Sequence, residues 1–339
     1  MKVILPVAGR GTRLRPHTHA KAKSLVRVAG KTVLEHIITR LEAIDVAEYI
    51  FIVDDNGTQI EDFMRQNFPS LPCTYIPQCE KLGPAHAVFL AAERIFPGDD
   101  VLVVFNDTIF ITALDKITEL CADCDGLVYS HEVEDYQRFG VNVVRDDYIV
   151  DMVEKPDTPI SRLAQVGLYY LKDGEAFMRY LQQSIHAGEK EKGEFYLPAV
   201  FMRMIKAGKK LRAPLLDAWL DCGKPENLLE TNRYLLRGHN TCAGECINSV
   251  IVEPVHIGKG AKVNNSVIGP NVSIARGSVV ECAIISDSII NADSEVTNVV
   301  LRRSILGDSV RLVGAAQNMS MGDHSVVELE SGFCGEELK

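Results

Sequence analysis

The residues best suited to chemistry lie in a glycine-containing loop near the start of the chain. Gly9 and Gly11 can adopt backbone conformations that bring their N–H groups close to a ligand, in an anion-binding concavity. Arg13 and Lys23 follow, and their side chains can neutralise phosphate oxygens, arginine through a bidentate fork and lysine as a point charge. Residues 1–31 carry eight basic side chains and no acidic one, although the whole chain has a net charge of −10. We therefore expect a compact polyanion at this loop and no binding of nucleic acid by the acidic chain.

Two aspartates follow apolar segments further along the chain. Asp107 comes after the run 101–105, and Asp221 comes after Trp219-Leu220. Carboxylates at strand ends can bind a metal ion, but an aspartate there is often only a turn former or a helix cap. Each one alone is therefore weak evidence for a metal site.

The elements that must position these residues alternate between strands and helices. Buried strands are predicted at 3–7, 49–53, 73–76 and 101–105, and amphipathic helices at 33–44, 58–67 and 84–95. This alternation predicts an α/β fold with a mostly parallel sheet and crossover helices. Ligands of such sheets bind beyond the carboxyl ends of the strands. The loop 9–13 and Asp107 both follow such ends.

A different pattern begins near residue 246. Aliphatic residues recur at steps of five or six from Ile257 to Leu312, separated by turns rich in Gly, Asn, Asp and Ser. A short unit of this kind cannot bury its apolar side alone, so neighbouring units must stack into a solenoid. Three such units make one triangular coil of a left-handed parallel β-helix, whereas a strand sandwich would repeat every two residues. We expect domains at 1–237 and 246–325, joined through a helix at 225–236.

The nine cysteines are odd in number and scattered, which argues against a disulfide framework. Cys121 with Cys124, and Cys242 with Cys246, would form a zinc site only if both pairs met in space, so free thiols are favoured. No apolar run approaches the roughly 18 residues of a membrane helix, and the first residues do not resemble a signal peptide. We expect a cytoplasmic protein that does not enter a membrane.

The segment from Leu5 to Leu25 resembles the signature of the sugar-1-phosphate nucleotidyltransferases. It reads Ala8-Gly9-x-Gly11-Thr12-Arg13-Leu14-x-Pro16-x-Thr18, followed by Lys23-x-Leu25. That family includes glucose-1-phosphate thymidylyltransferases and uridylyltransferases and mannose-1-phosphate guanylyltransferases. The resemblance covers roughly residues 1–237. It implies a Rossmann-like, mostly parallel sheet, and the hexapeptide repeats resemble the left-handed β-helix of longer members.

The resemblance also implies a reaction. A nucleoside triphosphate, with dTTP or UTP favoured, would transfer its nucleotidyl group to a sugar 1-phosphate, with glucose 1-phosphate favoured. Pyrophosphate would leave, and Mg²⁺ would be the cofactor. In this reaction Arg13 would hold the leaving β- and γ-phosphates, and Lys23 would stabilise charge at the transferring centre.

The family pattern assigns further residues by position. The implied nucleotide-binding residues are Ala8, Gly9, Gly11, Thr12, Gln78 and Gly83, with the Gln78 amide reading the base. The implied sugar-phosphate residues are Gly140, Glu154, Lys155 and Gly167, and the implied metal ligands are Asp107 and Asp221. His86 is given no catalytic role.

Several positions depart from the family pattern. Arg10 stands where a small residue is usual, Asn106 replaces a usual Gly, and Gln165 sits where many members have Asn. Pro198-Ala199 replaces a common Thr-Asp. These changes leave the phosphate and metal residues intact and leave the identity of the sugar open.

Three alternatives remain beside the favoured reaction. The enzyme could be a mannose-1-phosphate guanylyltransferase, although the Gln78 segment resembles pyrimidine users slightly more than purine users. A non-catalytic regulatory homologue would be expected to lose Lys23, Asp107 or Asp221, and all three are present. A bifunctional enzyme with acetyltransferase activity in the β-helix would need a catalytic histidine, for which only His256 and His324 are available. In each case we expect a homo-oligomer, a trimer or a tetramer, acting on small-molecule substrates.

Overall fold

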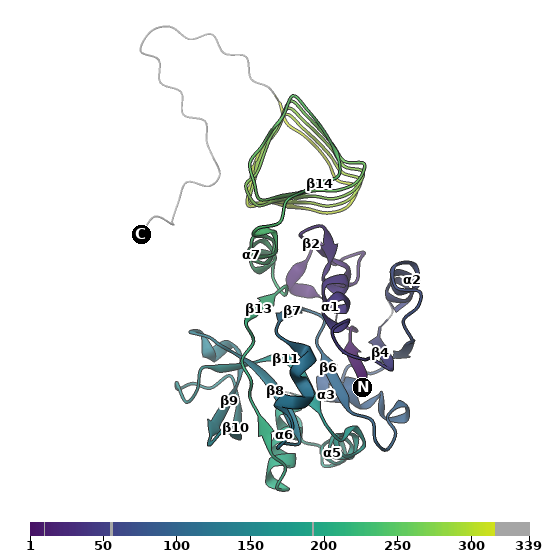
Figure 1. Ribbon diagram of the computed structural model, residues 1–339, viewed down its shortest axis with the longest axis vertical. Coiled ribbons are helices and arrows are strands. Elements are labelled where there is room, and N and C mark those ends of the chain that lie inside the picture. Colours follow the sequence, from purple (N-terminus) through teal and green to yellow (C-terminus); the bar gives the residue numbers. More distant parts are fainter. Residues whose placement is uncertain (10, 55–56, 192, 316–339) are drawn as a thin grey trace.

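The computed structural model describes residues 1–9, 11–54, 57–191 and 193–315 (Figure 1). Arg10, His324 and the expected end of the β-helix at 316–325 lie outside this part of the chain. Within the described residues, none of the helices has the length and apolar character needed to span a membrane.

A nine-stranded mixed sheet forms the centre of the first part of the chain. Its main path runs β10-β9-β11-β6-β1-β4-β5. The strands of the parallel half are β1 (Lys2–Pro6), β4 (Glu48–Val53), β5 (Cys73–Pro77) and β6 (Val101–Val104). The strands of the other half are β8 (Gly126–Glu132), β9 (Gly140–Arg145), β10 (Tyr148–Glu154), β11 (Leu163–Leu171) and β12 (Leu211–Arg212). In that half β11 pairs antiparallel with β6, β8 and β9, so the predicted parallel sheet continues into an antiparallel region.

Helices cover both faces of this sheet, because alternate strand residues point to opposite sides. Val3 and Leu5 pack into one hydrophobic core, while Ile4 between them belongs to the other. The first core is closed by α1 (Val33–Leu41) and α2 (Gly57–Asn67), and the second by α3 (Pro84–Phe89), α5 (Gly174–His186) and α6 (Leu197–Lys206). A single α-turn, α4 (Ile117–Leu120), precedes β8. The helix predicted at 84–95 is shorter, since α3 ends at Phe89 and only a 3-10 turn, Ala92–Arg94, follows.

Two small pairs of strands lie beside the main sheet. The hairpin β2 (Arg27–Val28) and β3 (Lys31–Thr32) precedes α1, whose first turn is capped by the Thr32 hydroxyl accepting from the Glu35 amide. The second pair joins β7 (Thr108–Ile111) to the distant β13 (Ala218–Asp221) in antiparallel register. This second pair brings together the two segments that carry the predicted metal aspartates.

The chain then passes through α7 (Pro225–Leu236) into a solenoid of three parallel sheets, drawn as a triangle in Figure 1. The first sheet contains β14 (Thr241–Cys242), β17 (Val255–Ile257), β20 (Val272–Ile274), β23 (Ile289–Ile290) and β26 (Ile305–Leu306). The second contains β15 (Glu245–Ile247), β18 (Lys262–Asn264), β21 (Val279–Glu281), β24 (Glu295–Thr297) and β27 (Arg311–Val313). The third contains β16 (Val250–Ile251), β19 (Val267–Ile268), β22 (Ile284–Ser286) and β25 (Val300–Arg302).

The repeat of five to six residues seen in the sequence corresponds to the pairing of strands in successive coils of the solenoid. Ile257, Ile274 and Ile290 stack in successive coils of the first sheet, and all three are fully buried in a core of their own. Asn248, Asn265 and Asn298 occupy left-handed turn positions, with φ between 49° and 55°. Asparagine tolerates that conformation better than most residues, which explains its recurrence in the turns. The predicted fold class, an α/β sheet followed by a β-helix, is confirmed.

The first sheet of the solenoid rests on the α/β part of the chain. Its outward column pairs Thr241, His256, Ser273, Ile289 and Ile305 in successive coils. Ile289 is buried in the same core as α1, and the Ser273 hydroxyl donates to Asn232 of α7 at 2.6 Å. One of the three solenoid faces is therefore an internal interface.

Candidate active site

The pairing of β7 with β13 brings Asp107 and Asp221 to the same end of a two-stranded unit. Asp107 immediately precedes β7, and Asp221, the last residue of β13, pairs with Thr108. The Cys222 N–H donates to the carbonyl oxygen of Asp107 at 2.8 Å. Two carboxylates separated by more than a hundred positions thus become neighbours.

Lys23 and Arg13 approach the first of these carboxylates. Lys23 Nζ donates to Asp107 Oδ2 at 2.6 Å, and Arg13 Nη2 lies 3.9 Å from the same oxygen. The Lys23 side chain is only 9% exposed, so its charge depends on this partner, whereas the Asp107 side chain is 27% exposed. Burial alone would raise the pKa of Asp107, but the charge and hydrogen bond of Lys23, with Arg13 farther away, hold that pKa below its ordinary value.

The loop backbone sets the position of these cations. Gly11 has a φ of 59°, and a Cβ there would lie 3.1 Å from the side chains of both Thr18 and Lys23. The Thr18 hydroxyl donates to the Gly11 carbonyl at 2.7 Å. A 3-10 turn, Thr12–Leu14, then carries Arg13. Glycine at position 11 therefore permits both the turn and the close packing of Lys23.

Arg13 also lies close to Gly223, two residues after the second aspartate. A Cβ on Gly223 would come within 3.1 Å of Arg13 Nη2 and 2.8 Å of Asp221 Oδ1. Asp221 Oδ1 accepts from the Gly223 amide at 2.7 Å, and Asn227 of α7 donates to Oδ2. A side chain at position 223 would therefore crowd both Asp221 and Arg13. Sequence reasoning had not singled out Gly223 or Asn227.

A cavity of about 240 Å³ opens beside Asp107. Its lining includes five residues that the sequence assigned to the site: Ala8, Gly9, Gln78, Gly83 and Asp107. Lys81, Asn106 and Glu194 also line it, and no role had been given to Lys81 or Glu194. Lys81 could have been noticed, because it lies between Gln78 and Gly83 in the segment implied to read the base. Glu194 reaches the cavity from a segment distant in sequence, just before the departure at Pro198-Ala199.

Gly83 has a structural reason of its own to be glycine. Its φ is 111°, and a Cβ would lie 2.6 Å from the backbone nitrogen and oxygen of Phe195. The Phe195 amide donates to Leu82 and its carbonyl accepts from Ala85. Because Gly83 has no side chain, the cavity wall can pack directly against the segment that carries Glu194.

The implied sugar-phosphate residues gather on β9, β10 and β11. Gly140 pairs with Glu154, and a Cβ on Gly140 would meet Glu154 Oε2 at 2.7 Å. Lys155 Nζ lies 3.4 Å from Glu154 Oε1. The unusual Gln165 donates through Nε2 to Asn142 Oδ1 at 2.9 Å, so part of its amide is already bound.

Phe105 links these residues to the cavity beside Asp107. It lines that cavity, and a Cβ on Gly167, where φ is 77°, would lie 2.8 Å from its side chain. Phe105 also meets Tyr169 edge to face, with ring centroids 5.8 Å apart. The implied nucleotide-binding and sugar-phosphate-binding parts of the site therefore both contact Phe105.

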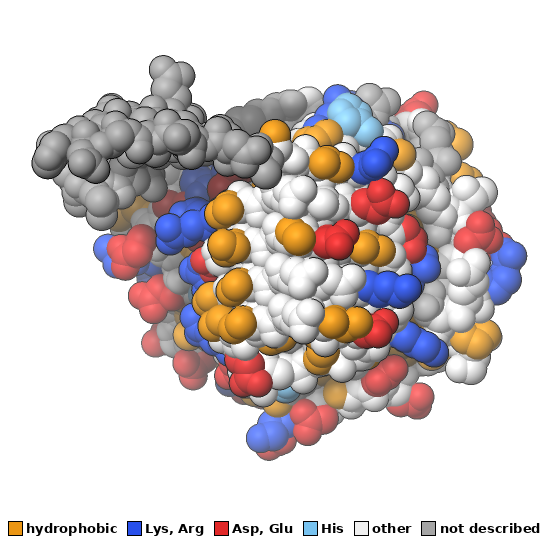
Figure 2. All heavy atoms as spheres, turned by 90° about the horizontal axis from the view of Figure 1, so that it is seen from above, with side chains coloured by type: hydrophobic (Ala, Val, Ile, Leu, Met, Phe, Trp, Pro, Cys, Tyr) orange, Lys and Arg blue, Asp and Glu red, His pale blue; other side chains and the backbone are white. Residues whose placement is uncertain are grey.

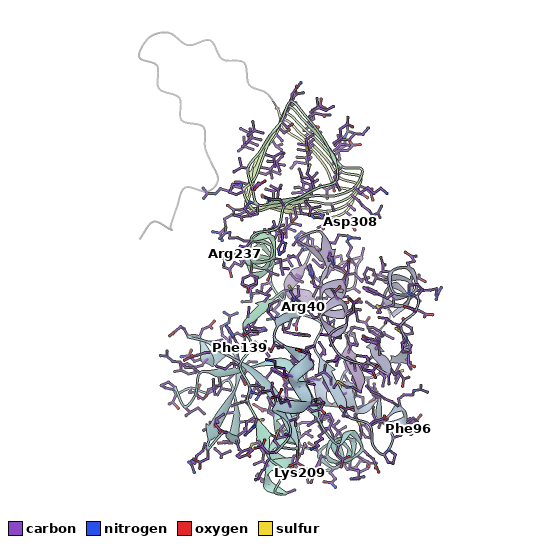
Figure 3. The ribbon with its side chains drawn as sticks, viewed as in Figure 1. Arg40, Phe96, Phe139, Lys209, Arg237 and Asp308 are labelled. Carbon is purple, nitrogen blue, oxygen red and sulfur yellow. The ribbon has the colours of Figure 1, made fainter. Side chains whose placement is uncertain are left out.

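A larger cleft, of about 480 Å³, adjoins Asp221 on the side of α7. Phe139, Trp219 and Tyr234 contribute its aromatic lining, and Asp221 is the one predicted site residue in it. Phe139 and Trp219 form an edge-to-face pair with centroids 5.1 Å apart (Figure 3 labels Phe139).

The residues behind two alternative interpretations, the cysteine pairs as a zinc site and His256 as a catalytic histidine, lie in different surroundings. The eight described cysteines are free, with the Sγ atoms of Cys121 and Cys124 3.1 Å apart. The described residues contain no group of three or more His, Cys, Asp or Glu side chains arranged for a metal ion. His256 packs so closely on Gly30 that a Cβ there would lie 2.3 Å from its ring, which places this histidine at the internal interface.

Comparisons with known proteins agree with one another. A family model described as nucleotidyl transferase matches residues 2–238. A glucose-1-phosphate thymidylyltransferase of Streptomyces antibioticus is 30% identical over 98% of this chain and 100% of its own. The bifunctional protein GlmU of Methanocaldococcus jannaschii is 32% identical over 77% of this chain and 61% of its own. A solved Bacillus anthracis structure, assigned as a glucose-1-phosphate thymidylyltransferase in complex with sucrose, has a TM-score of 0.62 at 25% identity, covering 71% of this chain and 97% of that one.

Proposed function

The chain belongs to the nucleotidyl transferase family, and we infer that it transfers a nucleotidyl group from a nucleoside triphosphate to a sugar 1-phosphate. We propose dTTP or UTP as the donor and glucose 1-phosphate as the acceptor, by analogy with the relative of similar length. The observation that best supports this reaction is the meeting of Arg13 and Lys23 with Asp107 beside the cavity lined by Gln78.

The proposed chemistry requires positioning more than proton transfer. A sugar 1-phosphate carries about −1.5 to −2 charges near neutral pH, so its phosphate oxygen is already a nucleophile. That oxygen forms a bond to the α-phosphorus while the bond from the α-phosphorus to the bridging oxygen breaks, releasing pyrophosphate. The obstacle is repulsion between two polyanions, which fixed cations reduce.

The basic residues take separate parts of this task. We assign Arg13 to the β- and γ-phosphates, because a guanidinium binds two oxygens at once. Lys23 would bind oxygens at the α-phosphate, next to Asp107. On the acceptor side, Glu154 would accept hydrogen bonds from sugar hydroxyls and Lys155 would bind the sugar phosphate.

Asp107 and Asp221 fit a magnesium ion. Mg²⁺ in phosphate-transferring sites is typically bound by one or two carboxylates together with substrate phosphates and water. Two carboxylates at adjacent strand positions, Asp107 still partly exposed, provide that donor set. The ion would supply positive charge that lowers the repulsion between the two phosphates.

We also propose a division into domains 1–237 and 246–325 and assembly into a homo-oligomer. Val250, Val267, Ile284 and Val300 form an outward column on the third solenoid sheet, one residue in each coil. Val250, Ile284 and Val300 are 58%, 52% and 76% exposed, and Figure 2 shows rows of hydrophobic side chains across this end of the molecule. Such a continuous apolar stripe is unusual on a lone chain, and a second copy is the occupant we propose.

A pyrophosphate-release assay tests the reaction. Each of dTTP, UTP and GTP would be paired with glucose, mannose and glucosamine 1-phosphates, with Mg²⁺ and with a chelator in its place. We expect the fastest release from a pyrimidine triphosphate with glucose 1-phosphate and loss of release in the chelator. Absence of release with all nine pairs would refute the catalytic proposal.

A further inference from the structure

The segment between Arg13 and Lys23 is held from two sides by parts of the chain distant in sequence. On one side, Gln59 of α2 accepts from the Ala22 amide and donates to the Ala20 carbonyl, both at 3.0 Å. On the other side, Lys21 pairs with Asp308 of the solenoid. Figure 3 labels Asp308 at the edge of the solenoid that faces the N-terminal part of the chain.

Asp308 is fixed by the solenoid rather than free to follow Lys21. Its Oδ1 accepts from the Ala292 amide of the preceding coil at 3.2 Å, which leaves Oδ2 for Lys21. The neighbouring Ser309 amide donates to the Ala292 carbonyl at 2.8 Å. The carboxylate therefore has a defined position in the last described coils of the solenoid.

The solenoid is in turn fixed to the α/β part of the chain. Arg233 of α7 pairs with Asp287 at 2.7 Å, and Asn232 donates to the Asn271 carbonyl at 3.1 Å. Together with buried Ile289, these contacts make Asp308 part of a rigid support. A shift of the solenoid face would be transmitted to Lys21.

Lys23 is two residues beyond Lys21. It begins a 3-10 turn, Lys23–Leu25, in which the Leu25 amide donates to the Ala22 carbonyl at 2.9 Å. Its ammonium reaches Asp107, so the position of this short turn determines where the ammonium meets a phosphate. Misplacement of a catalytic group by about 1 Å can cost about 100-fold in rate.

We propose that Asp308 is a positioning residue, through which the solenoid holds Lys21 and thereby places Lys23 for nucleotidyl transfer. The inference rests on the proposed function. It gives the solenoid a part in turnover that is separate from oligomerisation, although none of the described solenoid residues lines the cavity beside Asp107.

Asp308→Asn is the central variant, because asparagine can still accept from the Ala292 amide but presents no charge to Lys21. Asp287→Asn is the matched control: it breaks the Arg233 ion pair at the same interface, but the Asn232 and Ile289 contacts that hold the solenoid remain, and it does not touch the loop. We expect Asp308→Asn to lower kcat about tenfold, with KM for the triphosphate changing less, and Asp287→Asn to stay within about twofold of wild type. Asp308→Glu, which restores the charge, should recover most of the loss.

Hydrogen exchange of the amides at 20–25, measured without substrates, provides a second readout that does not depend on activity. We expect faster exchange in Asp308→Asn than in Asp287→Asn or wild type. Equal kcat in the two asparagine variants would overturn the proposal, whatever the exchange shows. Equal exchange in all three proteins would overturn it as well. If wild type releases no pyrophosphate with any substrate pair, the proposed function fails, and the exchange comparison still decides whether Asp308 holds the loop.

Discussion

The carboxylate of Asp221 accepts hydrogen bonds at both oxygens, from the Gly223 amide at Oδ1 and from Asn227 at Oδ2. Asp221→Asn keeps the volume of the side chain and one of the two acceptors, but it replaces the other oxygen with an NH2 donor and removes the negative charge. We predict a fall in kcat of about 10²–10³-fold, because the negative charge that we propose holds Mg²⁺ beside the phosphates is lost. Pyrophosphate release at saturating substrates measures it.

Asp217→Asn is the control for that variant. Asp217 is exposed and lies directly before β13, at the end of the strand remote from Asp221. Its removal should leave kcat within about twofold of wild type, as surface substitutions usually do. Comparable losses in both variants would contradict the metal role of Asp221.

His36 in α1 makes the free energy of unfolding depend on pH. Burial lowers its pKa to about 4; the bond to the Val28 carbonyl opposes this in part, and repulsion by Lys31 and Arg40 adds a smaller lowering (Figure 3 labels Arg40). Between pH 4 and the ordinary value of 6.5, the unfolded chain binds a proton that the folded chain does not. Stability contributed by this residue is therefore full above pH 6.5 and is lost as the pH falls, by at most about 1.4 kcal/mol per pH unit.

Urea unfolding at pH 7 and pH 5 measures this effect. His36→Gln keeps a donor for the Val28 carbonyl but cannot bind the proton, so the difference in unfolding free energy between the two pH values should shrink. His19→Gln, at an exposed histidine of the N-terminal loop, serves as the control and should leave the difference as in wild type. An unchanged difference in His36→Gln would exclude His36 as its source.

At the scale of elements, local patterns and long-range contacts differ in what the sequence can predict. The helical period of Leu34, Ile37 and Leu41 and the five-to-six-residue period of the solenoid follow from burial of one side, so both were visible in the sequence. The antiparallel half of the main sheet was not predicted, because β9, β10 and β11 follow one another without the helices that separate the strands of residues 1–105. The pairing of β7 with β13 joins segments over a hundred residues apart, and periodicity carries no information about it.

The candidate site divides in the same way. Gly9, Gly11, Arg13 and Lys23 lie close together in the sequence, in the segment that carries the family resemblance, so their grouping could be predicted. The contribution of Glu194 to the cavity and the ion pair of Lys21 with Asp308 depend on tertiary packing. No role was assigned to Glu194, Lys21 or Asp308 from the sequence, and only the folded chain shows what each of them contacts.

Gly269 tests whether the solenoid turn depends on the absence of a side chain. Its φ is 110°, and a Cβ would lie 1.8 Å from the carbonyl oxygen of Val252. Gly260 also has a positive φ, 74°, but the nearest atom to its Cβ would be 3.9 Å away. We predict that Gly269→Ala lowers the free energy of unfolding by more than about 2 kcal/mol and Gly260→Ala by about 1 kcal/mol. Thermal unfolding of both variants measures the loss of stability. Equal losses would show that the positive φ alone, and not the contact with Val252, destabilises the variants.

For the whole molecule, the three solenoid faces have different surroundings. The first packs on the α/β part of the same chain, and the second presents charged residues such as Lys262, Glu281 and Arg311. The third carries the exposed aliphatic column ending at Val300. Because the first face is already covered and the second is charged, the third is the face available for a second copy.

The double variant Ile284→Glu with Val300→Glu places two charges in the middle and at the end of that column, where burial against another chain would be strongly disfavoured. We predict that the wild-type chain sediments as an oligomer and that the variant sediments near the 37.4 kDa of one chain. Val313→Glu is the matched control, since Val313 is 58% exposed but lies on the second face, and it should remain oligomeric. The far-ultraviolet circular dichroism of all three should coincide, because both substituted columns point away from the solenoid core. A wild-type monomer, or an oligomer that persists in the double variant, would exclude this face as the interface between copies.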